Sequence, residues 1–192
     1  MCSKSCCQNP EHLLECQFLS AMPTKVNPDV FNFVCENLYD VITPLRMYGL
    51  KNLKPESWKI LMGMESHVKL WKKVPQWIEE HIYVIDFILK KVKPKGLDEE
   101  LIFTLLGIGY TNDFSSDVGN GANLRMTYAQ TAMFSHDCAP NLARYIDGID
   151  SNFTMKTYAS RNIAKGEKLA ITYIDILAPG PVRKDALKKV FY

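Results

Sequence analysis

The sequence predicts an α+β fold, in which a helical N-terminal part precedes a C-terminal part built of β-strands. Between residues 28 and 109, apolar residues recur every three or four positions, which is the period of an amphipathic helix. Beyond Asn141 the period falls to two, as in half-buried strands. The chain has 192 residues, of which 47% are hydrophobic, so it can bury a core of its own.

The first predicted helix begins at Asn27, which acts as the N-cap, with Pro28 at the first helical position. We expect this helix to end at Thr43, because Pro44 lacks a backbone donor and disfavours a helical residue before it. Its apolar face comprises Phe31, Val34, Cys35, Leu38, Val41 and Ile42. Cys35 is therefore expected to be a core residue.

Three further helices are predicted in the same part of the chain. Pro55 and Pro75 open the second and third, because proline is favoured in the first helical turn, and Asp98 opens the fourth. The third has the widest apolar face, formed by Trp77, Ile78, His81, Ile82, Ile85, Ile88, Leu89 and Val92. His67 and His81 have no ligand partner nearby in the sequence, so we interpret both as structural.

Short strands and a terminal helix are predicted for the rest of the chain. Residues 115–123 are rich in Gly, Ser, Asp and Asn, which is typical of a mobile surface loop. Strands are expected at residues 142–146, 153–159 and 168–174. Asp147 and Gly148 lie between the first two, so these form a hairpin. Residues 181–192 suit a short helix.

The composition gives no clear sign of nucleic-acid or membrane binding. With 23 basic and 21 acidic residues, the formal net charge of +2 attracts neither an anionic polymer nor an anionic surface. The best apolar run, residues 82–89, is too short to span a bilayer and contains Asp86. No apolar segment resembles a signal peptide, so we expect an intracellular protein of the cytoplasm or nucleus.

The densest basic cluster comprises Lys90, Lys91, Lys93 and Lys95. It ends the third helical pattern, where cations complement the helix dipole and cap the last turn. A surface that faces a substrate is the alternative.

Three cysteines and a histidine near the N-terminus have the spacing of metal ligands. Cys2 and Cys6 are four residues apart, and so are His12 and Cys16. A separation of one helical turn lets two ligands face one ion, and sulfur with imidazole nitrogen suits zinc. A frayed terminus with cysteines placed by chance is the alternative. In a reducing compartment, metal binding or core packing is favoured over disulfides for all six cysteines.

Two motifs that lie well apart in the sequence indicate the chemistry. The first is Ser135-His136-Asp137-Cys138-Ala139-Pro140-Asn141; the second is Gly166-Glu167-Lys168-Leu169, followed by Tyr173. In this order they resemble the two halves of a SET-domain active site, Asn-His-Ser-Cys-x-Pro-Asn, then Gly-Glu-Glu-Leu, then a tyrosine. The sequence departs from this pattern at Ser135, where the family has Asn, and at Asp137, where it has Ser.

SET domains transfer a methyl group from S-adenosylmethionine to a lysine side chain of a protein. The resemblance implies that Tyr173 is the catalytic residue, which orients the lysine amine and interacts with the sulfonium. It also implies that Ser135, His136, Asn112 and Asn141 contribute to cofactor binding. Asn112 belongs to a segment that resembles the family's Asn-x-Phe element; a polar residue that opens a loop is the alternative.

The departures from the family pattern predict weakened cofactor binding. Ser135 offers one hydroxyl on a short stem, whereas asparagine offers a donor and an acceptor at longer reach. Losing a hydrogen bond to a charged ligand group costs about 1.5–3 kcal/mol. Asp137 also adds a carboxylate beside the pocket. We expect Cys138 to pack inside rather than to react, because no basic residue is near it in the sequence.

The N-terminal segment resembles the end of a MYND zinc finger, which reads Cys-Ser-x-x-Cys, a short spacer, then His-x-x-x-Cys. That family binds two ions in crossed fashion, so Cys2 and Cys6 would complete one site, and His12 and Cys16 the other. Alternatively, the four residues gather around a single ion. The order of all these motifs resembles the SET-and-MYND (Smyd-type) methyltransferases, most closely their divergent arthropod branch.

This resemblance implies four segments: a partial MYND-type zinc finger over residues 1–21, a helical insert over 22–110, the C-terminal part of a SET domain over 111–178 and a short helix over 179–192. In the SET fold, the first motif is threaded, knot-like, through a loop closed by the final strand, which places both motifs side by side. The family's Gly-x-Gly loop and its C-terminal cysteine cluster are missing, so we expect a chain truncated at both ends.

Two functions are compatible with these observations. The first is an S-adenosylmethionine-dependent protein-lysine methyltransferase, in an incomplete or weakly active form, whose partner is a protein substrate. The alternative is a catalytically inactive SET-like protein that binds other proteins through its MYND remnant or its helical surface.

Overall fold

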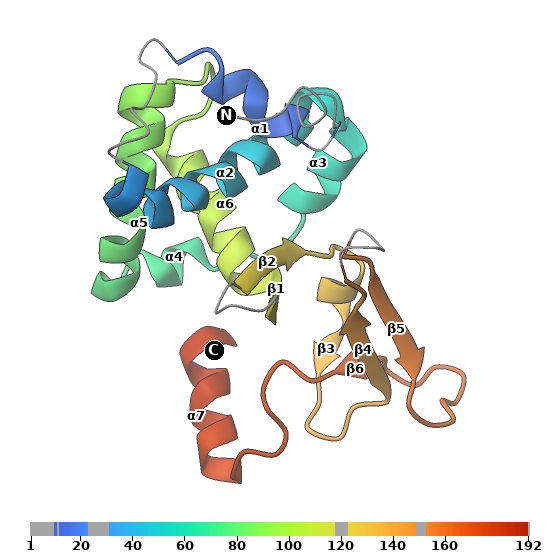
Figure 1. Cartoon of the computed structure of the whole chain (residues 1–192). Helices are drawn as coiled ribbons and strands as arrows, with labels where there is room; N and C mark the ends of the chain where they lie inside the picture. The colour runs from blue at the N-terminus through green and yellow to red at the C-terminus, as the bar shows by residue number, and fades with distance from the viewer. Residues whose placement is uncertain (1–9, 11, 23–30, 118–122, 149–152, 192) are drawn as a thin grey trace. The chain divides into compact units, whose positions relative to one another are not determined.

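The computed structural model divides into two compact units, Met1–Tyr110 and Thr111–Tyr192. It describes residues 10, 12–22, 31–117, 123–148 and 153–191. The first unit is helical, and the second combines short strands with a terminal helix (Figure 1), so the predicted α+β class is confirmed. Within the described part of the chain, no helix is long and apolar enough to cross a membrane.

The first unit is built from helical elements, and the last of these runs two residues into the second unit. In chain order they are α1 (Leu13–Leu19), α2 (Phe31–Leu53), α3 (Pro55–Met62), α4 (Val68–Trp71), α5 (Pro75–Phe87), the π-helical turn η3 (Ile88–Val92) and α6 (Glu99–Asn112). The predicted starts are confirmed: α3 and α5 open with proline, and Asp98 Oδ1 accepts a hydrogen bond from the Leu101 N–H at 2.9 Å.

The prediction that the first helix ends before Pro44 is wrong, because Pro44 lies inside α2. An internal proline costs about 3 kcal/mol. Residues on both sides of it bury apolar side chains: Val41 is 1% exposed and Leu45 is fully buried. Because each such side chain contributes about 1.5–3 kcal/mol, burial of this face outweighs the break. The predicted start at Asn27 lies outside the described residues.

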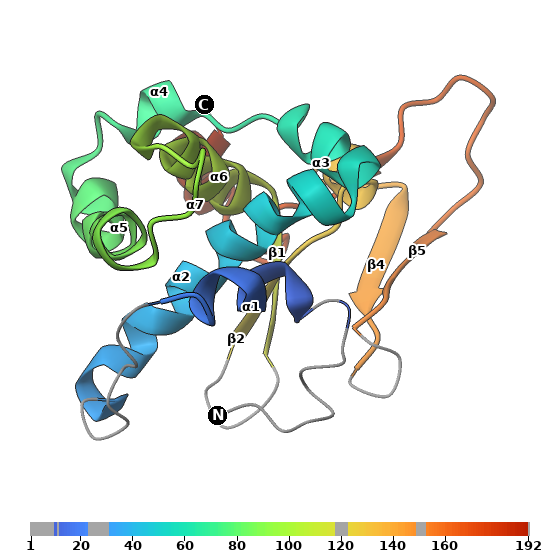
Figure 2. The same ribbon diagram turned by 90° about the horizontal axis from the view of Figure 1, so that it is seen from above.

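Close approach of α1 to α2 depends on a glycine. A Cβ atom at Gly49 would lie 2.3 Å from the backbone oxygen of Leu14, so only glycine allows this contact. Figure 2 shows α1 lying along α2. The core of this unit is apolar; side chains with at most 1% exposure include Leu45, Val84, Ile85, Ile88, Ile102, Leu105 and Ile108.

The two helical histidines have local partners. The ring of His81 stacks on Trp77, with 4.4 Å between centroids, and its Nδ1 lies 2.7 Å from the Trp77 carbonyl oxygen. His67 precedes α4 in the left-handed region, at φ 48°, and its N–H donates to Glu65 Oε1. Both contacts are local and support the structural interpretation.

The described residues of the second unit form three pairs of short strands. Its elements are β1 (Asp113–Asp117), β2 (Asn123–Thr127), the 3₁₀ turn η4 (Thr131–Met133), β3 (Ser135–His136), β4 (Leu142–Ile146), β5 (Met155–Ala159), β6 (Ala170–Ile171) and α7 (Gly180–Phe191). The pairs β1–β2 and β4–β5 are antiparallel, whereas β3 and β6 are parallel. The predicted β4–β5 hairpin and the terminal helix are confirmed.

Two predictions for this unit need correction. The loop predicted over residues 115–123 is wrong at its ends, because Ser115 and Ser116 pair with Arg125 and Leu124 across a hairpin. Regular pairing satisfies the backbone groups of this polar stretch, so its composition does not prevent strands. The strand predicted over residues 168–174 is shorter, since only Ala170 and Ile171 pair with β3.

A small apolar cluster supports the second unit. Phe114, Leu142 and Ile171 are its buried members, with exposures of 8%, 8% and 0%. The half-buried residues around them are Tyr128, Ala132, Phe134, Ile146, Met155, Ile163 and Tyr173. The cluster therefore joins β1, β4 and β6, and it lies beside both sequence motifs.

Candidate active site

His136 and Tyr173 meet because β3 and β6 run parallel to each other. Ser135 pairs with Ala170 and His136 with Ile171. The backbone N–H of Tyr173 donates a hydrogen bond to His136 Nδ1 at 3.0 Å. The two ring centroids are 5.4 Å apart. The two motifs that are separate in the sequence are thus in direct contact.

Tyr173 is held at both ends by the first motif and its neighbour. Its hydroxyl donates to the backbone oxygen of Phe134 at 2.5 Å, while its N–H bonds to His136. The side chain is half-buried. Both hydrogen bonds fix the ring relative to the segment from Phe134 to His136, so the tyrosine is oriented by the protein itself.

The hydrogen bonds of His136 define its protonation. Because Nδ1 accepts from the Tyr173 N–H, the neutral ring carries its proton on Nε2, which lies 3.4 Å from Cys138 Sγ. Burial lowers the pKa of His136; the Asp137 carboxylate opposes this, and the Arg183 guanidinium adds to it. The pKa therefore falls below the usual 6.5, and the imidazole is uncharged at neutral pH.

Asn141 ties the two motifs together. Its Nδ2 donates to Glu167 Oε1 at 3.0 Å and to the Lys168 carbonyl at 2.9 Å, and its Oδ1 accepts from the Ala170 N–H at 2.9 Å. The residue is only 3% exposed. These bonds occupy both ends of its amide, so any contribution of Asn141 to a cofactor pocket acts through the backbone that it holds.

Glu167 is an ionised partner in the same arrangement. Hydrogen bonds from Arg161 Nη2 at 2.5 Å, from the Ala164 N–H at 3.0 Å and from Asn141 lower its pKa to about 2. A carboxylate with this pKa stays charged at neutral pH. Glu167 therefore fixes the turn before β6 rather than exchanging protons.

The two remaining predicted cofactor residues belong to β3 and to the end of α6. Ser135 is half-buried in β3, next to His136. Asn112 is the half-buried last residue of α6, directly before β1. Phe114, two residues further on, packs with Leu142 and Ile171 in the apolar cluster. The described hydrogen bonds thus unite His136, Asn141 and Tyr173, and the roles of Ser135 and Asn112 stay predictions.

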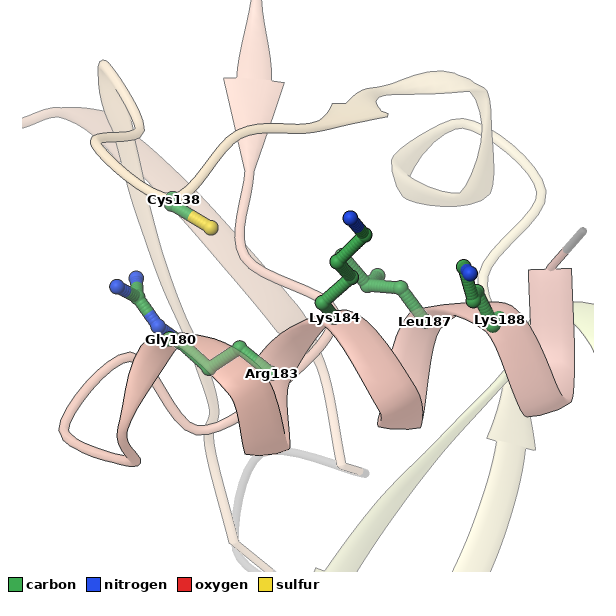
Figure 3. Close-up of a pocket in the computed structure, with 6 residues that line it drawn as sticks. All are labelled: Cys138, Gly180, Arg183, Lys184, Leu187 and Lys188. Carbon is green, nitrogen blue, oxygen red and sulfur yellow. The ribbon is translucent and has the colours of Figure 1, made fainter.

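The prediction that Cys138 packs inside is wrong, because this residue is exposed. It lines a cavity of about 440 Å³ together with Arg183, Lys184 and Lys188 of α7 (Figure 3). These basic residues are close to the thiol in space but far from it in the sequence. The Arg183-Lys184 pair was visible in the sequence, but no local pattern indicates that α7 would lie against Cys138.

The predicted zinc ligands are described only in part. Cys2 and Cys6 lie outside the described residues. His12 Nδ1 lies 2.9 Å from Glu15 Oε1, and Arg46 donates to both carboxylate oxygens of Glu15, at 2.6 and 2.9 Å. Burial opposes ionisation of Glu15, but the hydrogen bonds from Arg46 and His12 lower its pKa overall. Among the described residues no three His, Cys, Asp or Glu side chains are grouped to hold a metal.

Comparison with known proteins identifies the family of this chain. Residues 51–174 match the SET domain, so the chain belongs to the SET-domain family. It is 24% identical to N-lysine methyltransferase SMYD2-B of Danio rerio over 197 residues, which cover all of this chain and 43% of that protein. It is also 27% identical to histone-lysine N-methyltransferase SET5 of Saccharomyces cerevisiae (strain YJM789) over 92 residues, 48% of this chain and 15% of that protein. The chain thus spans less than half the length of either relative.

Proposed function

We propose that this chain is the site-bearing part of an S-adenosylmethionine-dependent protein-lysine methyltransferase of the SET/MYND type. The contact of His136 with Tyr173 carries the proposal, because it joins the two motifs from which such a site is built. Membership of the SET-domain family supports it, and so do the names of two relatives, which describe lysine methyltransferases. The proposed partner is a protein with an accessible lysine.

The charge state of the site fits a sulfonium ligand. When bound, S-adenosylmethionine supplies an electrophilic methyl group on a positively charged sulfur. The lowered pKa of His136 leaves an uncharged ring there, and the neighbouring Tyr173 ring offers a face that attracts cations. We assign His136, Ser135 and Asn112 to direct contact with the cofactor, and Asn141 to holding the backbone around it.

Tyr173 orients the lysine in this proposal. The transfer requires a neutral amine aligned with the methyl group, and alignment supplies much of the acceleration. Because the tyrosine is fixed by Phe134 and His136, it needs no rearrangement before the amine arrives. A half-buried surrounding also favours the neutral amine, since desolvation lowers the pKa of a lysine.

The finer features of the family belong to the same proposal. We propose that the two motifs cross in the threaded, knot-like manner of the SET fold, and the parallel β3–β6 pair, which brings them together, supports this. The division into residues 1–21, 22–110, 111–178 and 179–192 would then follow the zinc finger, the insert, the SET part and the final helix. Cys2, Cys6, His12 and Cys16 would bind zinc, in two half-sites or around a single ion. A measurement that finds no zinc bound per chain would exclude both arrangements.

Calorimetry with S-adenosylmethionine, followed by transfer of a labelled methyl group to core histones, tests the proposed function. We expect binding by the wild-type chain, and transfer that falls about 100-fold in the Tyr173→Phe variant, a loss typical of removing one oriented hydroxyl from an active site. Tyr158→Phe is the matched control, because Tyr158 is a tyrosine with 54% exposure on β5. It should leave transfer unchanged.

Two results would go against the proposed function. Absence of S-adenosylmethionine binding would favour the alternative, a SET-like protein that binds other proteins without catalysis. Full transfer by the Tyr173→Phe variant would contradict the role given to that tyrosine.

A further inference from the structure

The cavity beside Cys138 combines a thiol with a cationic wall. Its lining comprises Cys138, Gly180, Arg183, Lys184, Leu187 and Lys188, and its volume is about 440 Å³. Figure 3 shows the sulfur of Cys138 directed toward α7, with the side chains of Arg183 and Lys184 on either side. Among the described residues that line it, three are cationic and none is acidic. The Cys138 thiol is exposed and is not part of a disulfide.

Asp137 and Asp185 carry the carboxylates adjacent in sequence to residues that line this cavity, and neither lines it. Asp185 of α7 pairs with Lys189 at 2.8 Å, and both side chains are largely exposed. The Asp137 carboxylate accepts a hydrogen bond from the Ala139 N–H at 2.8 Å. In contrast, the Nε of Arg183 is buried and has no hydrogen-bond partner in the described part of the chain. Among the described residues, no salt bridge neutralises the positive charge that lines the cavity with Cys138.

The charge of Arg183 also acts on His136, two residues before Cys138. Burial is the main cause of the lowered pKa of His136; the Asp137 carboxylate opposes it, and the Arg183 guanidinium makes a smaller contribution that lowers the pKa further. The guanidinium therefore acts on the segment that carries Cys138. An anion that enters the cavity would reduce this repulsion while its apolar part contacts Leu187 and the aliphatic stems of the basic residues.

We propose that Cys138 is a covalent modification site that selects anionic disulfides, such as oxidised glutathione. The Cys138 thiol loses its proton to solvent, and the resulting thiolate attacks one sulfur of the disulfide. A new bond forms between Cys138 Sγ and that sulfur, the original S–S bond breaks, and the second half leaves as a thiolate that takes up a proton. Oxidised glutathione is the oxidant, and no further reactant is needed.

Electrostatic attraction provides the selectivity. Cations that line a cavity raise the local concentration of an anionic reactant, an effect worth roughly 10- to 1,000-fold in rate. A neutral disulfide gains nothing from the same charges. The product also has a local consequence: its sulfur takes the place of the thiol that lies 3.4 Å from His136 Nε2, and His136 in turn holds Tyr173. Any effect of this adduct on methyl transfer rests on the proposed function; the modification itself does not.

The test compares two disulfides of different charge, oxidised glutathione and neutral hydroxyethyl disulfide. Each rate of adduct formation at Cys138 is measured by peptide mass mapping and divided by the rate of the same reagent with N-acetylcysteine. We expect the normalised rate for oxidised glutathione to exceed the neutral one by about 10-fold at low salt, and the excess to shrink in 0.5 M salt, which screens charges beyond about 4 Å.

Charge-removing variants locate the selectivity. Lys184→Gln with Lys188→Gln changes two exposed residues, and Arg183→Gln is a second, independent variant. In both, the excess should fall several-fold. Lys189→Gln is the matched control, because Lys189 lies on the same helix but pairs with Asp185 and does not line the cavity. Hydrogen exchange of α7 verifies that each variant keeps the helix.

Three results would overturn the proposal: equal normalised rates for the two disulfides, an excess that survives both charge-removing variants, or faster adduct formation at Cys16 than at Cys138. Because no step uses a methyl donor, these results are independent of whether the protein is a methyltransferase. A chain that fails to transfer methyl groups would leave the expected labelling pattern unchanged.

Discussion

The two units of this protein are stabilised in different ways. The helical unit buries many large apolar side chains, and Leu45, Ile88, Ile102, Leu105 and Ile108 are fully buried. The second unit has a small cluster around Phe114, Leu142 and Ile171. What joins its motifs is a set of hydrogen bonds between the backbone and the side chains of His136, Asn141 and Tyr173.

This difference determines which substitutions each unit tolerates. Apolar packing is non-directional, so a change that keeps volume and polarity costs little in the helical unit. Hydrogen bonds are directional, and a buried group that loses its partner costs free energy. The second unit therefore depends on particular polar atoms, and these are also the atoms that position the proposed site. Exchanging an apolar residue for a polar one in the helical unit, and a polar residue for an apolar one in the second unit, tests this contrast.

The largest effect is expected for Leu105→Asn in α6. The change removes a fully buried apolar side chain and buries an amide without partners, which together cost about 4–5 kcal/mol. Leu105→Met keeps the volume and should cost less than about 1.5 kcal/mol. Urea unfolding, followed by hydrogen-exchange mass spectrometry on peptides of the helical unit, measures both. Similar losses for the two variants would contradict packing as the main source of stability.

A smaller effect, about 3 kcal/mol, is expected for Asn141→Leu. Leucine has a similar volume, but the Lys168 carbonyl and the Ala170 N–H lose their partner. The loss should appear in peptides of the second unit. Asn162→Leu is the control, because that asparagine is exposed and should tolerate the change. If Asn141→Leu proved as stable as wild type, the second unit would have to be held by packing after all.

The smallest effects concern pH, and two carboxylates of the second unit should act with opposite sign. Burial raises the pKa of Asp113, and a Thr127 hydrogen bond and Arg125 only partly oppose this. Its neutral form is favoured in the folded state, so its contribution is present at low pH and is lost as pH rises through the raised pKa. Glu167 has its pKa lowered from 4.5 to about 2, so its contribution is present above 4.5 and is lost as pH falls toward 2.

Variants separate these two dependences. Asp113→Asn should stabilise the second unit at neutral pH and lose this advantage below pH 3.8, the usual pKa of an aspartate. Glu167→Gln should destabilise the unit at neutral pH and flatten its response between pH 4.5 and 2. Urea unfolding midpoints of both variants and the wild type, measured across pH, test these two assignments. The same sign of slope for both residues would show that one assignment is wrong.

Local signals in the sequence predicted much of the fold. Proline at the starts of α3 and α5, the Asp98 cap and the alternation around Asp147 are short-range features, and each is confirmed. The prediction that the helix ends before Pro44 was wrong. The local preference of proline against a helix interior is outweighed by burial of Val41 and Leu45, which depends on the tertiary fold. The β1–β2 hairpin was missed because its strands are polar and lack the apolar alternation that indicates a strand.

In the candidate site, too, some features could be predicted from the sequence and others depend on the tertiary fold. The two motifs indicated that His136 and Tyr173 belong together, and the parallel β3–β6 pairing brings them into contact. The environment of Cys138 could not be predicted. Arg183 and Lys184 are far from it in the sequence, and they line the same cavity only because of where α7 lies. Long-range placement of a helix leaves no periodic signal in the sequence.

The central claim is that the two motifs form one site through the hydrogen bond from the Tyr173 N–H to His136 Nδ1. Long-range ¹H–¹⁵N NMR of the labelled imidazole tests it directly, with Tyr173 identified by residue-specific labelling. The structure predicts a neutral ring at pH 7 with its proton on Nε2, and a pKa below 6.5. It also predicts a scalar coupling between the Tyr173 amide and Nδ1. A ring protonated on Nδ1 at pH 7, without coupling to the Tyr173 amide, would contradict the account.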